Sequence, residues 1–387
     1  MPTELTPADL QRYSRHLVLP DFGIEGQKML KSSSVLVVGT GGLGAPLLQY
    51  LVAAGIGRIG LIDFDTIDQS NLQRQVLFTT ADIGKRKTTV AAQRLKAQNP
   101  LIEIVPYHLM LNSENALDII KDYDVVADGS DNFPTRYLVN DACVLLDKVN
   151  VYASIFRFEG QVSVFNYLEE DGKRGPNYRD IFPEPPPPGM VPSCAEGGVL
   201  GVLPGIIGSL QANEVIKVLT GVGKPLSGRL FLFDAATFDT RVLNIQKSDT
   251  NPLTGLNPTQ KGLIDYDAFC GLTGSETTNQ YTLQEITVKE LKTWRDQEKD
   301  HQLIDVRKDF EIAISNIGAE HILQEEIEQH IDRIRKDIPV VIHCRSGKRS
   351  GDVIEILEKK YGFQNLYNLV GGVLAWSDEI DPTLPKY

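Results

Sequence analysis

Two short stretches of this sequence combine residue types that could carry out chemistry. The first is the glycine-rich run Gly-Thr-Gly-Gly-Leu-Gly at 39–44, which follows an apolar run and precedes a helical pattern. Glycines at such a turn let the backbone approach a phosphate, and the N-terminus of the next helix favours negative charge. The run predicts a nucleotide site, although an NAD-dependent dehydrogenase would fit this feature equally well.

Charged residues after this run help to distinguish between the possible nucleotide ligands. Asp63 ends the next apolar run and Asp65 lies two residues further on, where an acid that binds ribose is expected. A polar cluster follows at 70–74, Lys87 begins a helical pattern, and Asp-Asn at 131–132 follows a further strand pattern. Cations and an aspartate at strand ends suit a triphosphate with Mg²⁺ better than a dinucleotide, because they neutralise charge on pyrophosphate and hold the metal.

The second stretch is Cys344 with the loop Arg-Ser-Gly-Lys-Arg at 345–349, between the apolar run 338–342 and a helical pattern at 351–360. Backbone N–H groups of a strand-to-helix turn and three cationic side chains favour a thiolate. Such a cysteine can accept sulfane sulfur, store it as a persulfide and pass it on. A phosphatase is the alternative, but the phosphatase loop is longer than this one, in which four residues separate Cys344 from Arg349.

Alternating strand and helix patterns must position both stretches. Buried strands are predicted at 35–38, 59–62, 102–105 and 124–127, with helices at 44–54, 87–98 and 209–219. This alternation predicts an α/β fold with a mostly parallel, Rossmann-like doubly wound sheet. A second, smaller α/β pattern occupies 281–387. We expect a first domain at 1–247, and a linker and crossover tail at 248–280, which is rich in Asn, Thr, Gly, Pro and Ser.

Composition and charge exclude several classes of protein. The 387 residues are too many for one ordinary core and suit two domains. The net charge of −12 argues against nucleic-acid binding, because phosphate backbones attract surplus Lys and Arg. No apolar stretch approaches the ~20 residues of a membrane span, and the polar N-terminus lacks an apolar signal core, so we expect a cytoplasmic protein without membrane contact. The four cysteines are then expected to be thiols.

The first domain resembles the E1-like adenylyltransferases of the MoeB and ThiF type. The resemblance covers roughly 10–271 and rests on Leu-Ile-Asp-Phe-Asp at 61–65, Ser-Asn-Leu-Gln-Arg-Gln at 70–75, Asp-Ile-Gly-Lys-Arg-Lys at 82–87 and Ser-Asp-Asn at 130–132. It implies that ATP activates the C-terminal glycine of a ubiquitin-like sulfur carrier ending in Gly-Gly. AMP supplies a good leaving group, and the site mainly positions and neutralises charge.

The resemblance also assigns residues. Arg15 resembles an arginine that reaches into the partner subunit's site, which implies a homodimer. Cys194 resembles a crossover-loop cysteine that either takes the carrier as a thioester or resolves a persulfide adduct. Arg74 and Asp131 are the expected catalytic residues of the adenylylation step, and Asp131 is the expected Mg²⁺ ligand. ATP and its metal are assigned to Gly39, Gly41, Gly42, Asp63, Asp65, Ser70, Asn71, Leu72, Gln73, Arg74, Lys87, Asp131 and Asn132.

One feature of this family is missing from the sequence. Many members hold a structural Zn²⁺ with two Cys-x-x-Cys pairs, but the corresponding positions here are Asn177, Asp180, Asn251 and Thr254. Structural zinc requires four Cys or His ligands. We therefore expect no structural zinc.

The second domain resembles rhodanese over about 281–387. The resemblance rests on the Cys344 loop, Leu-Ile-Asp-Val-Arg at 303–307 and Gly-Gly-Val-Leu-Ala-Trp at 371–376, and Ser-Asn-Ile-Gly-Ala at 315–319 departs from the usual His-Ile-Pro-Gly-Ala. It implies that a persulfide on Cys344 supplies sulfur to the adenylate. A tether of 30 to 35 residues would span roughly 30 Å. The expected persulfide loop consists of Arg345, Ser346, Gly347, Lys348 and Arg349.

Two other functions fit part of the sequence. One is an NAD-dependent oxidoreductase with an unrelated C-terminal domain. The other is a non-catalytic module that docks ubiquitin-like proteins, although the joint presence of Arg74, Lys87, Asp131, Cys194 and Cys344 argues against it. The carrier's pathway (molybdopterin, thiamin, tRNA thiolation or cysteine synthesis) stays open, as does the upstream sulfur donor, for which a cysteine desulfurase is a candidate.

Overall fold

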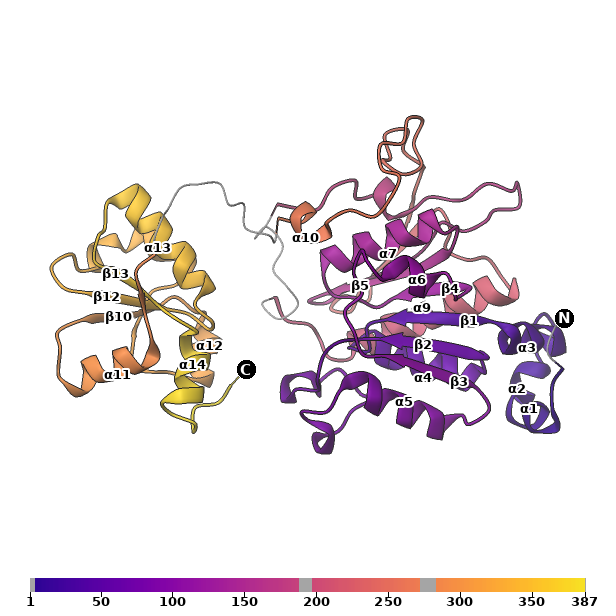
Figure 1. The fold of residues 1–387 in the computed structure, drawn as a ribbon, viewed down its shortest axis with the longest axis horizontal. Coiled ribbons are helices and arrows are strands. Elements are labelled where there is room, and N and C mark those ends of the chain that lie inside the picture. The colour runs from indigo at the N-terminus through magenta and orange to yellow at the C-terminus, as the bar shows by residue number, and fades with distance from the viewer. Residues whose placement is uncertain (1–3, 188–196, 272–282, 387) are drawn as a thin grey trace. The chain divides into compact units, whose positions relative to one another are not determined.

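The chain forms two compact units, residues 1–275 and 276–387. The structure is a computed structural model that describes residues 4–187, 197–271 and 283–386 (Figure 1). Within these ranges, no helix is both long enough and apolar enough to cross a membrane.

The first unit contains an eight-stranded sheet in the order β3-β2-β1-β4-β5-β6-β7-β8. Its first five strands are parallel and its last three are antiparallel. Because β1 lies between β2 and β4, the chain reverses direction across the sheet there, as in doubly wound folds. The strands are β1 (Ser34–Val38), β2 (Arg58–Ile62), β3 (Glu103–Tyr107), β4 (Val125–Asp128), β5 (Val149–Phe156), β6 (Glu159–Phe165), β7 (Arg229–Asp234) and β8 (Thr240–Asn244).

Helices cover both faces of this sheet (Figure 1). Val35 and Val37 of β1 pack into one core with α4, α5 and α9, whereas Leu36 and Val38 pack into a second core with α6 and α7. A strand buried on both faces needs a continuous apolar run, which explains why β1 was recognisable in the sequence. The helices are α1 (Pro7–Arg12), α2 (Ser14–Leu17), α3 (Gly23–Ser32), α4 (Gly44–Ala54), α5 (Lys87–Gln98), α6 (Ala116–Ile120), α7 (Phe133–Leu145), α9 (Leu203–Thr220) and α10 (Tyr266–Phe269).

Residues 248–271, which the composition placed in a linker and crossover tail, pack against the first unit. Tyr266 of α10 is buried and donates a hydrogen bond to Asp141 of α7 at 2.9 Å. Asp141 also holds the buried Arg179 through two hydrogen bonds of 3.1 and 2.7 Å. The chain between the described parts of the two units is therefore residues 272–282, which is shorter than the tether estimated from composition.

The four positions without zinc ligands are joined by hydrogen bonds. The Asn251 amide donates to Asp180 at 2.7 Å and to Asn177 at 3.2 Å, and the Asn177 amide donates to Thr254 at 3.1 Å. Asn177 and Asn251 are 0% and 1% exposed, so these bonds are shielded from water. This amide cluster connects the crossover tail to the segment around 177–180.

The second unit has a five-stranded, all-parallel sheet in the order β11-β10-β12-β13-β9. Separate apolar clusters lie on its two faces, as expected for a parallel sheet covered by helices on both sides. Together the two sheets confirm the predicted α/β class. The elements are β9 (Glu285–Ile286), α11 (Val288–Asp296), β10 (Gln302–Asp305), α12 (Asp309–Ile314), β11 (Glu320–His321), β12 (Val340–His343), α13 (Lys348–Tyr361), β13 (Leu366–Leu369) and α14 (Gly372–Glu379).

Candidate active sites

The first site lies where β1, β2 and β4 end. The carboxyl ends of these parallel strands meet at one edge of the sheet, where doubly wound folds bind ligands. A cavity of about 900 Å³, open to solvent, lies there, and nine of the thirteen residues expected to bind ATP line it. They are Gly39, Gly41, Gly42, Asp63, Asp65, Arg74, Lys87, Asp131 and Asn132.

The glycine-rich turn between β1 and α4 is too tight for side chains. Gly39 has φ of 90°, in the left-handed region that favours glycine. A Cβ on Gly44 would lie 2.0 Å from the carbonyl oxygen of Gly39, so α4 can start this close to β1 only with glycine. The turn therefore brings bare backbone to the cavity, as a phosphate-binding turn requires.

Asp63 fixes the shape of this turn. Its Oδ2 accepts hydrogen bonds from the backbone N–H of Thr40 at 2.9 Å and from the Thr40 hydroxyl at 2.8 Å. Its Oδ1 accepts from the N–H of Asp65 at 2.9 Å. An ionised carboxylate has about four acceptor positions, so Asp63 can still accept a ribose hydroxyl.

Two of the cations that line the cavity, Lys87 and Arg74, are held by neighbouring oxygens. Lys87 Nζ lies 2.8 Å from Asp65 Oδ2, and its side chain is 6% exposed whereas that of Asp65 is 48% exposed. Arg74 donates to the carbonyl of Ser70 at 3.0 Å, and its Cδ would lie 3.6 Å from a Cβ on Gly42. Lys87 and Arg74 thus line the same cavity as the glycine-rich turn and can neutralise a phosphate bound there.

Residues 70–73 support the site from outside the cavity lining. The short 3₁₀ helix Gln69–Asn71 is capped by Asp68, whose carboxylate accepts the N–H and hydroxyl of Ser70 at 2.8 and 2.6 Å. Asn71 accepts the N–H of Arg74 through its carbonyl at 3.1 Å. Ser70, Asn71, Leu72 and Gln73 thus build the turn that presents Arg74.

The loop after β4 presents Asp131 to solvent. Asn132 caps α7 by accepting the N–H of Thr135 at 3.0 Å. Asp128 at the end of β4 is 1% exposed and accepts the N–H of Ser130 at 2.9 Å, and burial raises the pKa of its carboxyl group. Asp128 therefore shapes the loop from inside, while Asp131 is exposed at the cavity.

Sequence reasoning did not assign Gln75, Ser130 and Arg136 to the site, although all three line the cavity. Each is less than 10% exposed, and Arg136 donates to the carbonyl of Ser130 at 3.4 Å. Within the described residues, Gln75 Oε1 and Ser130 Oγ are buried without a hydrogen-bond partner. Buried polar atoms normally have partners, so these two atoms fit a polar ligand in the cavity. Gln75 and Ser130 belong to the motif runs, but Arg136 lies outside them.

The donors present also fit a nucleotide-bound magnesium ion. Among the described residues, no group of three or more His, Cys, Asp or Glu side chains could hold a metal. Mg²⁺ in nucleotide sites is held by one or two carboxylates together with phosphate oxygens. Asp131 can supply that carboxylate.

Two other expected residues are Arg15 and Cys194. Arg15 is exposed on α2 and is not among the residues that line the cavity of its own chain. Cys194 lies outside the described residues.

The second site is built on the turn from β12 to α13. Cys344 follows β12, and its Sγ accepts the backbone N–H of Gly347 at 3.2 Å. Gly347 caps α13 with φ of 94°, and a Cβ there would lie 3.2 Å from the carbonyl of Leu369. The Cys344 side chain is 1% exposed, so the sulfur lies at the base of the loop.

Helix α14 holds the back of this loop. The N–H groups of Val373 and Leu374 donate to the carbonyls of Cys344 and Arg345 at 3.0 and 3.1 Å. A Cβ on Gly372 would lie 2.4 Å from the Cys344 carbonyl oxygen, so only glycine allows this approach. With its carbonyls bound by α14, the loop can direct N–H groups towards the sulfur.

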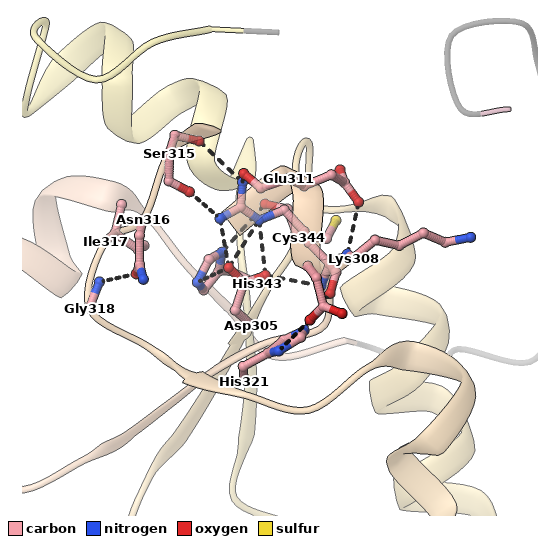
Figure 2. Close-up of polar contacts among 12 residues, drawn as sticks. Asp305, Lys308, Glu311, Ser315, Asn316, Ile317, Gly318, His321, His343 and Cys344 are labelled. Carbon is pink, nitrogen blue, oxygen red and sulfur yellow. Dashed lines mark hydrogen bonds and ion pairs between the residues drawn. The ribbon is translucent and has the colours of Figure 1, made fainter. Parts of the chain in front are cut away.

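A buried ionic network lies beside the loop (Figure 2). Arg307, which is fully buried, pairs with both oxygens of Asp305, and its guanidinium also donates to the carbonyl of Ser315 at 2.7 Å. Glu311 of α12 accepts two hydrogen bonds of 2.7 Å from Arg349, the last residue of the persulfide loop. The network thus links the loop to β10 and α12.

The departure at 315–319 is accommodated locally. The hydroxyl of Ser315 accepts a hydrogen bond from Arg307 at 3.2 Å. The side chain of Asn316 accepts the N–H of Gly318 at 2.7 Å, which forms the turn that the usual proline would favour (Figure 2). The changed motif therefore connects to Arg307 through Ser315.

His343 and Trp376 have structural positions. His343 is completely buried, 3.6 Å from Asp305, and burial lowers the pKa of its imidazole to about 4. The ring is therefore neutral near pH 7. Trp376 is 5% exposed and packs into one of the two cores of the second unit.

The model of the ThiF family matches residues 13–254. The chain belongs to the ThiF family. Its ThiF unit is followed by a rhodanese unit, because the model of the rhodanese-like domain matches residues 287–379.

Some relatives resemble the chain over nearly its full length. The "Probable adenylyltransferase/sulfurtransferase MoeZ" of Mycobacterium tuberculosis is 44% identical over 99% of this chain and 96% of its own. The "Adenylyltransferase and sulfurtransferase MOCS3" of Xenopus laevis is 42% identical over 99% of this chain and 89% of its own. The chain is therefore an enzyme of the adenylyltransferase and sulfurtransferase class.

Further relatives resemble the ThiF unit alone. The "Sulfur carrier protein adenylyltransferase" of Thermus thermophilus is 56% identical over 69% of this chain and 98% of its own. Among solved structures, that of Escherichia coli MccB with ATP is 25% identical, with a TM-score of 0.52 over 63% of this chain and 73% of its own. Both findings agree with the predicted resemblance to E1-like adenylyltransferases.

Proposed function

We propose that the ThiF unit uses ATP to adenylylate the C-terminal glycine of a ubiquitin-like sulfur carrier ending in Gly-Gly, and that a persulfide on Cys344 then converts the adenylate to a thiocarboxylate. The observation that carries the first step is the cavity at the glycine-rich turn, where Arg74, Lys87 and Asp131 converge. The second step rests on the hydrogen-bonded sulfur of Cys344.

The first reaction forms an acyl-phosphate bond. The carrier carboxylate attacks the α-phosphorus of ATP, the bond between the α-phosphorus and its bridging oxygen breaks, and pyrophosphate leaves. Lys87 and Arg74 neutralise the charge that develops on pyrophosphate, and the glycine-rich turn positions the phosphates. Mg²⁺ held by Asp131 and phosphate oxygens would neutralise further charge.

The second reaction transfers sulfur. The outer sulfur of the Cys344 persulfide attacks the carbonyl carbon of the adenylate, the carbon–oxygen bond to AMP breaks, and an acyl disulfide forms on Cys344. A thiolate then attacks Cys344 Sγ, the sulfur–sulfur bond breaks, and the carrier leaves as a thiocarboxylate. We assign this attack to Cys194, after which a thiol reductant must reopen the Cys194–Cys344 disulfide.

A protein substrate also needs a docking surface. The edge strand β8 is exposed along its whole length, and Val242, Leu243 and the nearby Phe238 are 52%, 49% and 79% exposed. An exposed edge with apolar side chains suits the addition of another protein's strand. We propose this edge as the carrier's docking surface.

The decisive experiment offers ATP, Mg²⁺, a persulfide donor and a Gly-Gly-ending carrier to the full chain. We expect pyrophosphate release and a carrier heavier by the replacement of one oxygen with sulfur. Cys344→Ala should still release pyrophosphate but should form no thiocarboxylate. Thiocarboxylate formation at the normal rate in Cys344→Ala would show that the rhodanese unit is not the sulfur donor, and NAD binding without pyrophosphate exchange would favour an oxidoreductase.

We also propose that the active form is a homodimer in which Arg15 serves the partner's site. Exposed apolar residues lie near Arg15 in sequence, with Val18, Leu19 and Ile24 at 72%, 50% and 50% exposure. Arg15→Ala and Lys87→Ala should each abolish adenylylation, whereas a mixture of the two variants should recover activity through dimers that contain one intact site. No recovery after subunit exchange would place Arg15 in its own subunit's site or outside catalysis.

The upstream donor is proposed to be a protein persulfide, such as that of a cysteine desulfurase. Transfer of radioactive sulfur from a loaded desulfurase to Cys344 tests this assignment, with Cys344→Ala as the control.

A further inference from the structure

A buried hydroxyl touches the sulfur of Cys344. Ser350 lies in the first turn of α13 and is 0% exposed. Its Oγ is 3.5 Å from Cys344 Sγ, 3.1 Å from the carbonyl oxygen of Gly347 and 2.6 Å from Asn368 Oδ1. Asn368 of β13 is itself 5% exposed, so this group of atoms is shielded from water.

The hydroxyl cannot donate to all three neighbours. A serine carries one O–H proton and two acceptor lone pairs. Asn368 Oδ1 is the nearest acceptor, so in this arrangement the proton of Ser350 points to Asn368. The lone pairs of Ser350 then face the sulfur, which suits a protonated thiol that donates to Oγ.

We propose that Ser350 is a hydrogen-bond switch for Cys344. When Cys344 is a thiol, its S–H donates to Ser350 and the Ser350 hydroxyl donates to Asn368. When Cys344 is a thiolate, the Ser350 hydroxyl turns and donates to the sulfur, next to the N–H of Gly347. Ser350 then stabilises the charged form of the nucleophile, while Asn368 is a positioning residue that competes for the same proton.

The switch serves the step in which Cys344 receives sulfur, and it rests on the proposed role of Cys344 as sulfur acceptor. The Cys344 thiolate attacks the outer sulfur of a donor persulfide. The donor's sulfur–sulfur bond breaks, the donor leaves as a thiolate, and Cys344 becomes the persulfide. The charge leaves Sγ in this step, so the Ser350 proton is free to return to Asn368.

This arrangement makes the two neighbours of Ser350 act in opposite directions. Loss of the hydroxyl removes a donor from the thiolate, so Ser350→Ala should need a higher pH to ionise Cys344. Loss of the competing acceptor leaves the hydroxyl available to the sulfur, so Asn368→Ala should need a lower pH. Damage to the fold alone would give no reason for opposite shifts.

The test measures the alkylation rate of Cys344 by iodoacetamide between pH 5 and 10 in the full chain, with the modified cysteine quantified by mass spectrometry. The midpoint of the pH–rate profile should rise by about one unit in Ser350→Ala, a tenfold loss of thiolate below the midpoint, and fall in Asn368→Ala. Ser377→Ala is the matched control, because Ser377 is another buried serine of this unit, whose hydroxyl donates to the carbonyl of Leu384 at 2.8 Å.

Shifts of the two variants in the same direction, or an unchanged midpoint in Ser350→Ala, would overturn the switch. If Ser350→Ala fails to fold, the sign of the Asn368→Ala shift decides alone. Because alkylation needs neither ATP nor a carrier, the result does not depend on adenylylation. Failure of the whole proposed function would leave thiocarboxylate absent even with the expected pH profiles.

Discussion

The nucleotide site and the persulfide loop differ in how their polar groups are satisfied. In the nucleotide site, Lys87 pairs with a half-exposed aspartate, and Gln75 and Ser130 keep buried polar atoms without partners among the described residues. In the persulfide loop, the sulfur of Cys344 already accepts an N–H bond, and Arg349 is held by two bonds to Glu311. In the first site, buried polar atoms of the cavity lining can still bind a ligand, whereas in the second the sulfur and Arg349 are already held by groups of the protein.

The largest expected effect concerns Lys87. Lys87→Gln removes a cation from the cavity, so we expect adenylylation to fall by about two orders of magnitude. Sulfur transfer to Cys344 from a small donor should be unchanged, because that reaction uses the other unit. The control is Lys85→Gln, since Lys85 is outside the cavity lining and its side chain is 57% exposed. Equal losses in both variants would contradict the contrast between the sites.

The next largest expected effect is a loss of stability of the second unit at acidic pH. Burial lowers the pKa of His343 to about 4, below its ordinary value of 6.5, so the unfolded chain binds this proton more tightly. The stability contribution is complete above pH 6.5, is lost as the pH falls from 6.5 to 4, and amounts to about 3 kcal/mol.

The second unit should therefore lose stability over this range, as measured by denaturant unfolding at several pH values. His343→Asn should flatten the dependence. A flat profile in the unsubstituted chain would mean that His343 is not sealed from water.

Substitution of Gly372 tests the contact between α14 and the persulfide loop. Gly372→Ala should destabilise the second unit by about 2–3 kcal/mol, because Gly372 has φ of 56° and its Cβ would lie 2.4 Å from a carbonyl oxygen. In Gly318→Ala the φ of 76° is equally unfavourable, but no atom lies within 4 Å of the added Cβ. The control should therefore cost about 1 kcal/mol. Similar costs would show that the loop can move away from α14.

The smallest effect concerns the pair of Glu311 and Arg349. Glu311→Gln should destabilise the second unit by about 1–2 kcal/mol. The Glu311 side chain is only 6% exposed, and the substitution removes its negative charge from beside the partly buried guanidinium of Arg349. The comparison is Glu320→Gln, which breaks the exposed pair with Arg333 and should cost less than about 1 kcal/mol. If thermal unfolding gives equal shifts, the ion pair does not preorganise the loop.

The sequence predicted the parts of the fold whose signal is local. The strands at 35–38 and 59–62 correspond to β1 and β2 because strands buried on both faces are continuous apolar runs. The helix expected at 209–219 is α9, Leu203–Thr220, whose residues 203–208 were missed although Pro204 suits the first turn of a helix. The strands β9 and β11 are only two residues long and have no recognisable pattern.

Contacts between residues far apart in the chain could not be predicted from the sequence. The polar composition of 248–271 suggested a linker, yet Tyr266 is buried against Asp141, which lies 125 residues earlier in the chain. The hydrophobic periodicity of a sequence does not indicate such a contact. In the site, motif spacing led to Asp63, Lys87 and Asp131, whereas Arg136 is one arginine in an ordinary helical pattern and only the fold reveals its position at the cavity.

The burial of Cys344 affects which reagents can reach its sulfur. With its side chain 1% exposed, the unloaded thiol offers little surface to bulky reagents, whereas small electrophiles and a donor sulfur at the end of a side chain can approach it. An added sulfane atom extends about 2 Å beyond Sγ and carries reactivity towards the mouth of the loop. A large acceptor therefore reaches the outer sulfur of the loaded enzyme more easily than it reaches Sγ of the unloaded one.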